Sequence, residues 1–416
     1  MGIRYDQSRV GDLSKVVSPP YDVISPEDRV YYHKLHPSNF VRLVLGEEFE
    51  GDDDSNNRFT RARRYVEEWL EQGILKPDAF PAIYVYEQRF ELDGPRRVRG
   101  FTCAVKLHDY ADGVVLPHEN TLAKPKSQLA VLIRETQANL DSIYGLYADE
   151  QCELNEVMDR AAAAVPAAQA TDKNGVRHTL WIVADPAEIA RVVDFLRDKP
   201  VAIADGHHRY ETSLAYAKEA RERAGNPAGD LPSDWTTMTL VNVFCRDMTI
   251  YPTHRVVGNV PEDVMAGLDR ALGERFEIVE SSADKLLDDM FRLGAIGLYR
   301  PGRAVALKLK QGPWDSIPAS KASRKLELNV LHKVILEPLM GIDDDKLRNE
   351  THIVYARDPA EAIGLVDSGD RQAAFLLNHI AVKSVLEVAA AGEKMPQKAT
   401  YFYPKLLSGL VMRRMR

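Results

Sequence analysis

The side chains best suited to chemistry gather in one pentapeptide, "DGHHR" at residues 205–209. It directly follows the apolar run 201–204 and precedes a helical pattern, which predicts a buried strand ending near Ala204 and a helix beginning near His208. Such a junction suits an anion, because the first N–H groups of a helix lack backbone partners and the helix dipole favours negative charge. Asp205 would lie at the carboxyl end of the strand, and Arg209 offers a fork of donors to phosphate or carboxylate. We therefore predict that the pentapeptide lines a cleft; a polar turn in which Asp205 only caps the helix is the alternative.

A second group of polar side chains lies in "LPHENTLAKPKSQ" at residues 116–128. His118 and Glu119 place a proton carrier beside a carboxylate, as general acid–base chemistry requires. Lys124 and Lys126 are suited to phosphate, and Thr121 lies between the two pairs. The zinc-protease motif HExxH is absent, since no second histidine follows at the required spacing. An ordinary solvated loop is the alternative.

Two further phrases end or interrupt apolar elements. Residues 251–257, "YPTHRVV", supply the candidate substrate-binding residues Thr253, His254 and Arg255. Residues 395–409, "MPQKATYFYPKLLSG", supply the candidate phosphate-binding residues Lys398 and Lys405, together with Thr400, Tyr401 and Ser408. We predict that both phrases converge with the two groups above and with "PPYD", which contains Asp22, in a single pocket.

The common phosphate-binding and catalytic motifs are absent from the chain. There is no GxxxxGK[ST], no GxGxxG followed by a suitable acid, no GxSxG and no HRD–DFG pair. A phosphate site in this chain would therefore use a less common framework.

Composition limits the class of protein. The 416 residues are 45% hydrophobic, which allows a large core and about two or three domains. A net charge of -8 argues against a general nucleic-acid binder, so DNA is not an expected partner. The three cysteines lie far apart and indicate neither a disulfide framework nor a CxxC metal site. No signal-peptide pattern and no apolar run of about 18 residues occur, so we expect a cytoplasmic protein without a membrane partner; the oligomeric state stays open.

The order of expected elements favours an α/β or α+β fold. Residues 82–92 and 97–110 read as a hairpin, 59–75 as a helix closed by Gly73, and 179–225 as strand, helix, strand and helix in turn. Residues 259–311 follow the order helix, strand, helix, strand, strand. We expect four segments: an N-terminal α+β region (1–128), a core with the pentapeptide (129–258), a small α/β subdomain (259–311) and a C-terminal α/β segment that returns to the site (312–416).

The chain resembles a known family in five phrases: "VVSPPYDVIS", "PHENT", "ADGHHRYET", "PTHR" and "MPQKATYFYPKLLSGL". Together they resemble the bacterial and archaeal domain-of-unknown-function family "ten-fifteen" over essentially the whole chain. Residues 204–219, "ADGHHRYETSLAYAKE", are also similar to the Gly-x-x-Arg-x-x-Ala box of ParB and sulfiredoxin proteins, with Thr212 in place of the alanine. The box is similar to the phosphate loop of archaeal free serine kinase as well. This resemblance implies a ParB-like phosphate-binding core with additional α/β subdomains.

The resemblance also implies residue roles. Asp205, Gly206, His207, His208, Arg209 and Thr212 would bind the phosphates of a donor (ATP, ADP or pyrophosphate), with Mg²⁺ on Asp205. The expected activity is phosphoryl transfer to the hydroxyl of a small molecule, such as free L-serine. On physical grounds Glu119, beside His118, or Asp22 would serve as the base. A ParB-like nucleotide-binding regulator without turnover and a metal-assisted phosphoester hydrolase are the alternatives.

Overall fold

The computed structural model describes residues 1–416 except 120, 122, 246, 313–318, 397 and 416, and except the side chains of residues 123–125 and 321. The chain forms two compact units. Unit 1 contains residues 1–116, 121–248 and 404–416, and unit 2 contains residues 117–120 and 249–403. The division differs from the four consecutive segments expected from the sequence, because unit 1 takes in the last residues of the chain and unit 2 takes in a short early segment.

Unit 1 is built on a mixed sheet whose strand order over the described residues is β5-β10-β7-β11-β4-β3-β9-β8. The expected hairpin forms its centre, with Tyr84 opposite Thr102. β10 runs parallel to β5 and antiparallel to β7, so the strand before the pentapeptide is paired on both sides. The strands are β3 (Ile83–Glu91), β4 (Pro95–Lys106), β5 (Val115–Leu116), β7 (Ile143–Tyr147), β8 (Ala168–Thr171), β9 (Arg177–Val183), β10 (Val201–Asp205) and β11 (Trp235–Asn242).

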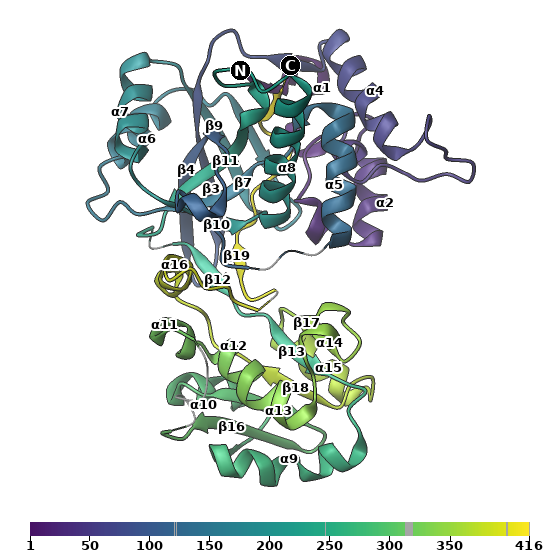
Figure 1. Ribbon diagram of the computed structural model, residues 1–416, viewed down its shortest axis with the longest axis vertical. Coiled ribbons are helices and arrows are strands. Elements are labelled where there is room, and N and C mark those ends of the chain that lie inside the picture. Colours follow the sequence, from purple (N-terminus) through teal and green to yellow (C-terminus); the bar gives the residue numbers. More distant parts are fainter. Residues whose placement is uncertain (120, 122, 246, 313–318, 397, 416) are drawn as a thin grey trace. The chain divides into compact units, whose positions relative to one another are not determined.

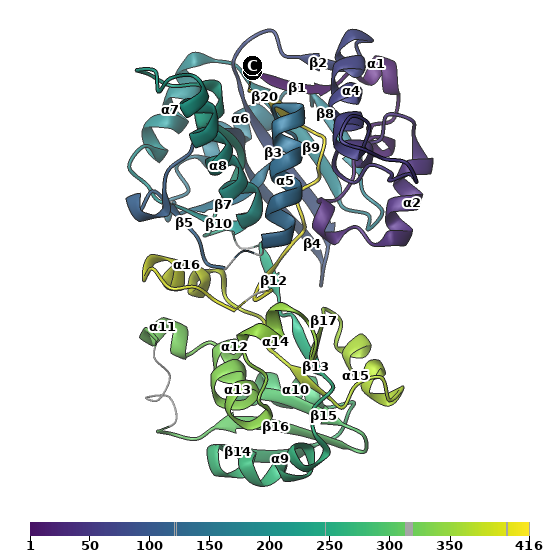
Figure 2. The ribbon, with the colours of Figure 1, turned by 45° about the vertical axis from the view of Figure 1, so that its right-hand side comes forward.

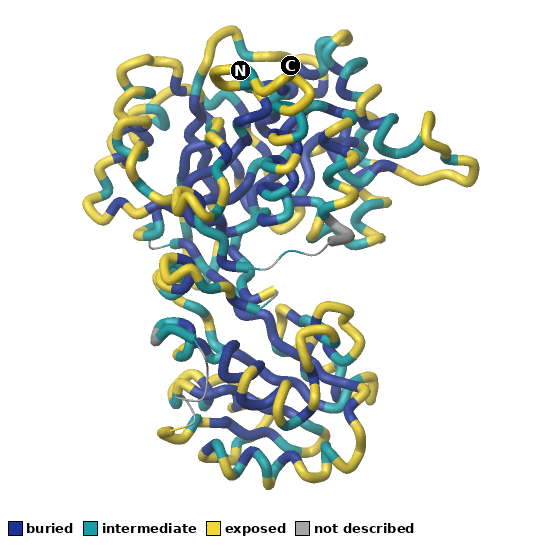
Figure 3. The backbone as a smooth tube through the Cα atoms, in the orientation of Figure 1, coloured by how far each residue is buried: buried dark blue, intermediate teal, exposed yellow. Residues whose placement is uncertain are grey.

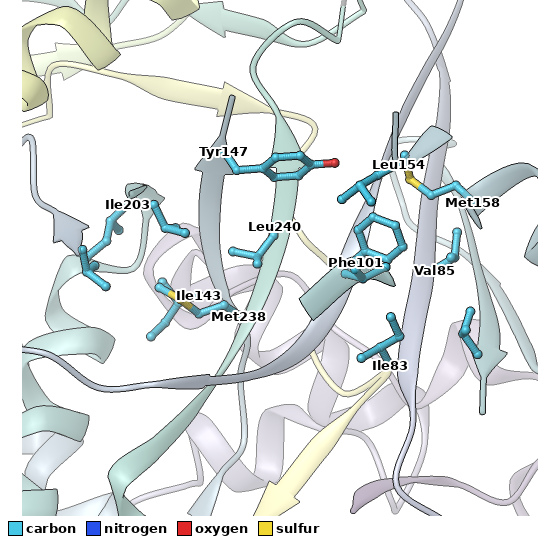
Figure 4. Close-up of a cluster of buried hydrophobic side chains, with 14 of the residues drawn as sticks. Ile83, Val85, Phe101, Ile143, Tyr147, Leu154, Met158, Ile203, Met238 and Leu240 are labelled. Atoms are coloured by element: carbon cyan, nitrogen blue, oxygen red, sulfur yellow. The ribbon is translucent and has the colours of Figure 1, made fainter. Parts of the chain in front are cut away.

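Helices cover this sheet. α8 (His207–Arg223) lies beside α5 (Ala123–Thr136), which in turn packs on α4 (Arg58–Glu71) (Figures 1 and 2). The core between sheet and helices includes Phe101 and Ile203 from strands and Met158 from α6 (Figure 4). The strands are buried while many loops are exposed, as Figure 3 shows. The remaining helices of unit 1 are α1 (Gln7–Val10), α2 (Pro26–Leu35), α3 (Val41–Val44), α6 (Asn155–Ala162) and α7 (Pro186–Leu196).

A second sheet ties the two ends of the chain to unit 1. Its order is β2-β1-β20-β6, formed by β1 (Gly2–Tyr5), β2 (Leu75–Pro77), β6 (Ala138–Asn139) and β20 (Met412–Arg414). The chain before β20 lies along the main sheet: Gln88 Nε2 donates to the Lys405 carbonyl at 2.8 Å, and the Leu407 N–H donates to Tyr86 Oη at 3.1 Å. These bonds fix the position of Lys405.

Unit 2 contains an antiparallel sheet with the order β14-β16-β15-β18-β13-β17 and a short ribbon of β12 and β19. Apolar residues of α10 and α15 pack on the sheet around Val256 and Leu376. The strands are β12 (Thr249–Tyr251), β13 (His254–Val257), β14 (Phe276–Ser281), β15 (Ile296–Arg300), β16 (Arg303–Leu309), β17 (Ile353–Ala356), β18 (Ala373–Leu376) and β19 (Tyr401–Tyr403). The helices are α9 (Glu262–Arg275), α10 (Leu286–Leu293), α11 (Lys321–Arg324), α12 (Glu327–Val330), α13 (Glu337–Met340), α14 (Asp344–Arg348), α15 (Pro359–Asp367) and α16 (Val382–Ala390).

The mixed α/β class expected from the sequence is confirmed, as is the order of elements over residues 259–311. The likeness of the core to ParB proteins stays a prediction. No helix among the described residues combines the length and the apolar character that crossing a membrane requires.

Candidate functional site

The pentapeptide lies where the sequence analysis expects it, between β10 and α8. β10 ends at Asp205, and α8 begins at His207. Gly206 separates them with φ 94°, a left-handed conformation that side chains rarely adopt. A Cβ on Gly206 would also lie 2.9 Å from Nε of Arg209. Both the turn and the close approach of the arginine therefore require glycine here.

Arg209 is the centre of a buried ion-pair network. Its Nη2 lies 3.1 Å from Asp205 Oδ2, and its Nη1 lies 3.6 Å from Asp141 Oδ2 and donates to the Ser142 carbonyl. Burial by itself lowers the pKa of Arg209, but the charges of Asp141 and Asp205 outweigh it and raise that pKa. The guanidinium is thus held charged and is oriented by the protein itself.

The C-terminal segment supplies the other polar groups of this network. Lys405 Nζ lies 3.2 Å from Asp205 Oδ1, and the lysine side chain is only 10% exposed. Ser408 Oγ donates to Asp141 Oδ1 at 2.6 Å. Asp205 therefore lies between two cations, one from α8 and one from the far end of the chain.

Asp22 completes the group of carboxylates. Loss of solvation within the protein is the largest cause that raises the pKa of Asp22, and the charge of Asp205 raises it further. The charges of Lys405 and Arg209 act in the opposite direction. The residue itself keeps access to solvent. Burial likewise raises the pKa of the neighbouring Tyr21 phenol. Asp22 is thus an exposed residue whose carboxyl holds a proton more readily than that of an ordinary aspartate.

The first turn of α8 faces this network with backbone donors. The N-cap residue before it, Gly206, has no side chain to cap the helix, which is 17 residues long. His207 is buried and His208 half-buried, and burial lowers the pKa of His208, which favours its neutral form. Thr212 is buried one turn further on and lines a small cavity of about 50 Å³ with Arg209 and Asp141.

His118 and Glu119 of the "PHENT" phrase belong to unit 2, where they contact the "MPQK" phrase, whereas Thr121 belongs to unit 1. The His118 carbonyl accepts a hydrogen bond from Met395 N–H at 2.7 Å, and Glu119 Oε1 accepts one from Ala399 N–H at 3.0 Å. The His118 ring, which is fully buried, lies 3.0 Å from Thr400 Oγ1 through its Nε2. Asn120 lies outside the described residues.

The "PTHR" phrase lies in the same unit and near the same residues. Arg255 is fully buried; its guanidinium donates to the carbonyls of Thr253 and Lys398, and lies 5.1 Å from the centre of the Tyr355 ring. Burial lowers the pKa of Arg255 to about 10, while Tyr355 and Glu119 act in the opposite direction. Lys398 forms an ion pair with Glu350.

The five phrases therefore fall into two groups. Asp22 of "PPYD", the pentapeptide and Lys405 come together in unit 1. In unit 2, Glu119 of "PHENT", the "PTHR" phrase and Lys398 come together. Their convergence in a single pocket stays a prediction. Of the lysines next to "PHENT", Lys126 forms an ion pair with Glu211 at 2.9 Å, and Thr121 donates to the same carboxylate. The side chain of Lys124 lies outside the described part of the chain.

Sequence reasoning missed Asp141 and Tyr21. Asp141 lies two residues before the buried strand β7, and Asp205 lies at the end of β10. A carboxylate beside a buried strand was the sequence signal that could have identified Asp141. Tyr21 stands next to Asp22, and only the fold reveals that both interact with Asp205 and Arg209.

The carboxylates of unit 1 are candidate ligands of Mg²⁺. Over the described residues, no three or more His, Cys, Asp or Glu side chains are arranged to hold a metal by themselves. Mg²⁺ in proteins is commonly bound by one or two carboxylates together with phosphate oxygens and water. Asp205, a carboxylate just before the first turn of α8, is the type of ligand that this mode uses.

A protein-family model matches most of the chain. Residues 1–334 match the family described as "Protein of unknown function (DUF1015)". The chain belongs to this family. None of the curated proteins matches it.

The solved structures that resemble this chain share little of its sequence and superpose on it with low TM-scores. A free serine kinase in complex with AMP has 14% identity and a TM-score of 0.38, over 72% of this chain and 86% of its own. A conserved hypothetical protein from Pyrococcus furiosus has 13% identity and a TM-score of 0.37, over 73% and 92%. C-terminally truncated SbnI from Staphylococcus aureus has 10% identity and a TM-score of 0.39, over 74% and 85%.

Proposed function

We propose that the protein is a phosphotransferase that moves a phosphoryl group from a nucleotide or pyrophosphate to the hydroxyl of a small molecule such as free L-serine. The observation that supports this most strongly is the placement of Lys405 and Asp205 at the first turn of α8, with Asp22 beside them. Phosphoryl transfer asks a protein mainly for positioning and for positive charge around the migrating group. Unit 1 provides both.

The donor phosphates would bind at the start of α8. The backbone N–H groups of His207 and His208 lie in the first turn of α8, where the helix dipole favours an anion. Lys405 adds a full positive charge at this point. Arg209 adds positive charge to the electrostatic potential at this point. Its ion pairs with Asp205 and Asp141 hold the two carboxylates in place.

Asp22 would accept the proton of the substrate hydroxyl. A carboxylate that retains a proton more readily than usual is also a stronger base when ionised. As the hydroxyl oxygen forms its bond to the terminal phosphorus, Asp22 takes the proton. The bond from phosphorus to the donor's bridging oxygen breaks, and its electron pair leaves with the donor.

Asp205 would hold Mg²⁺ that arrives with the donor phosphates, and the ion would neutralise charge on their oxygens. Glu119 stays the alternative base. Thr253, His254 and Arg255 stay predicted substrate contacts in unit 2, and Lys398 stays a predicted phosphate contact.

Phosphorus NMR tests this function directly. The purified protein is incubated with Mg²⁺, L-serine and ATP, ADP or pyrophosphate in turn, and a phosphomonoester signal that requires L-serine is expected. Release of inorganic phosphate without an acceptor would instead identify a hydrolase. Binding of the nucleotide with no turnover across a panel of amino acids and polyols would identify a regulatory module.

A further inference from the structure

A pocket lies in unit 2, at the edge of the sheet where three strands begin or end. β17 and β18 finish there, and β13, antiparallel to both, starts there. The cavity has a volume of about 520 Å³, within the range of about 300–1,000 Å³ that is typical of small-ligand sites. Most of the lining residues lie on α10, at the start of β13 and α15, and in the segments that follow β17 and β18, elements that are labelled in Figure 1.

One wall of the pocket is apolar and open to solvent. Leu287 and Phe291 lie four residues apart on α10, hence on one face of that helix, and are 43% and 75% exposed. Leu286 and Met290 on the neighbouring positions are buried in the core. The helix therefore has a second apolar face, and Leu287 and Phe291 on that face line the pocket.

The lining also contains a histidine with a hydrogen-bond donor. His254 is 1% exposed, and its Nδ1 accepts a hydrogen bond from Leu377 N–H at 3.2 Å. Burial lowers the pKa of His254 to about 4, so the ring is neutral and its single proton is on Nε2. Nε2 has no hydrogen-bond acceptor among the described residues. A buried donor without an acceptor indicates that something outside the described chain provides one.

Arg357 adds a positive charge to the lining. It follows β17 directly, is exposed to solvent, and its guanidinium carbon lies 4.0 Å from the centre of the Tyr401 ring. The aromatic ring holds the guanidinium in position without neutralising its charge. Two acidic residues also line the pocket. Asp358 is engaged as the cap of α15, where it accepts from Ala360 N–H at 2.9 Å, and Asp288 lies in the first turn of α10, where the helix dipole favours its charge.

We propose that this pocket binds a small carboxylic acid with an apolar or aromatic body. The carboxylate would lie toward Arg357 and His254, and the apolar body against Leu287 and Phe291. The site is distinct from the ion-pair network of unit 1, and the proposal does not depend on the phosphotransferase activity.

Calorimetry with three probes tests the proposed ligand. 3-Phenylpropionate and L-phenylalanine carry the acid, whereas phenethylamine carries the same ring without it. Both acids are expected to bind the full-length protein and the amine is not. Equal or tighter binding of the amine, or binding of none of the three, would overturn the proposal.

Variants at exposed positions locate the site without disturbing the fold. Arg357→Gln and Phe291→Ser are each expected to weaken binding of 3-phenylpropionate about tenfold or more. Each variant removes one contact with the ligand: the charge beside its carboxylate or the apolar surface beside its ring. Arg348→Gln is the matched control, because Arg348 is an exposed arginine of the same unit outside the pocket lining. Equal affinity of Arg357→Gln and Arg348→Gln would contradict the assignment.

Nitrogen NMR of the imidazoles should also show that the Nε2 resonance of His254 shifts when either acid is added. An unchanged resonance would exclude this histidine from the site.

Discussion

Lys405 Nζ lies 3.2 Å from Asp205 Oδ1, although one residue belongs to the C-terminal segment and the other to the end of β10. The contact exists because β20 pairs with β1 and the chain before it is bonded to β3 through Gln88 and Tyr86. The end of the chain therefore contributes a charge to the candidate phosphate site as well as a strand to the fold.

Replacement of Lys405 by methionine is expected to weaken binding of ADP or pyrophosphate about tenfold, because one full charge beside the phosphates is lost. Isothermal titration calorimetry in the presence of Mg²⁺ provides the measurement. Lys218→Met is the matched control: this lysine is on the exposed side of α8 and pairs with Asp109 at 2.6 Å. A similar loss of affinity in both variants would show that the effect is not specific to Lys405.

Arg209 is expected to be essential for stability. Arg209→Ala removes the partner of two buried carboxylates, Asp141 and Asp205, and should lower the free energy of unfolding by about 3–5 kcal/mol. Urea denaturation measures this change. Arg134→Ala, which removes an exposed pair with Glu219, should cost less than about 1 kcal/mol. Comparable losses in the two variants would mean that the network around Arg209 contributes little.

The junction at residues 201–209 could be predicted from sequence because its signals are local. An apolar run is followed by glycine and then by a helical pattern, and β10 and α8 form at these positions. The partners of Arg209 could not be predicted in the same way. Asp141 and Ser408 reach it through strand pairing and through the course of the last residues, which are long-range features. Local patterns therefore predicted the elements of the site, and tertiary contacts decided which side chains meet.

The division of the chain was also beyond local reasoning. Composition does not reveal that residues 404–416 return to unit 1, because that return depends on the pairing of β20 with β1 and β6. Nor does it assign His118 and Glu119 to one unit and the pentapeptide to the other, since both phrases are polar and follow apolar runs. Glu119 accepts its hydrogen bond from Ala399 in unit 2, a contact that no local pattern indicates.

Asp22 and Glu119 can be distinguished as candidate bases by their effect on turnover. Asp22→Asn should lower the turnover of an identified substrate by about two to four orders of magnitude and leave ADP affinity within a few-fold, because the amide cannot accept the proton. Activity of the parent protein should rise with pH through a pKa above that of an ordinary aspartate, because Asp22 acts in its ionised form and its pKa is raised. Stopped-flow or steady-state kinetics over a range of pH provide both readouts.

Glu119→Gln serves as the comparison for that experiment. The amide retains the acceptor oxygen for Ala399 N–H, so the local fold should persist. Parental turnover in Asp22→Asn together with a large loss in Glu119→Gln would assign the base to Glu119 and contradict the role proposed for Asp22.

His254 is expected to make unit 2 sensitive to acid. Its pKa is about 4 in the folded protein and about 6.5 in an unfolded chain, so folding favours the neutral ring. The stability that this preference provides is complete above about pH 6.5 and is lost as the pH falls toward 4, by up to about 3 kcal/mol at about 1.4 kcal/mol per pKa unit.

His254→Gln, which cannot titrate, should therefore show a smaller fall in the free energy of unfolding between pH 7 and pH 4 than the parent. Urea denaturation followed at several pH values measures both profiles. The pKa of His332 is also lowered by burial, but this residue is present in both proteins, so the difference between the profiles isolates His254. Parallel profiles would show that the imidazole of His254 titrates in the folded protein as it does in water.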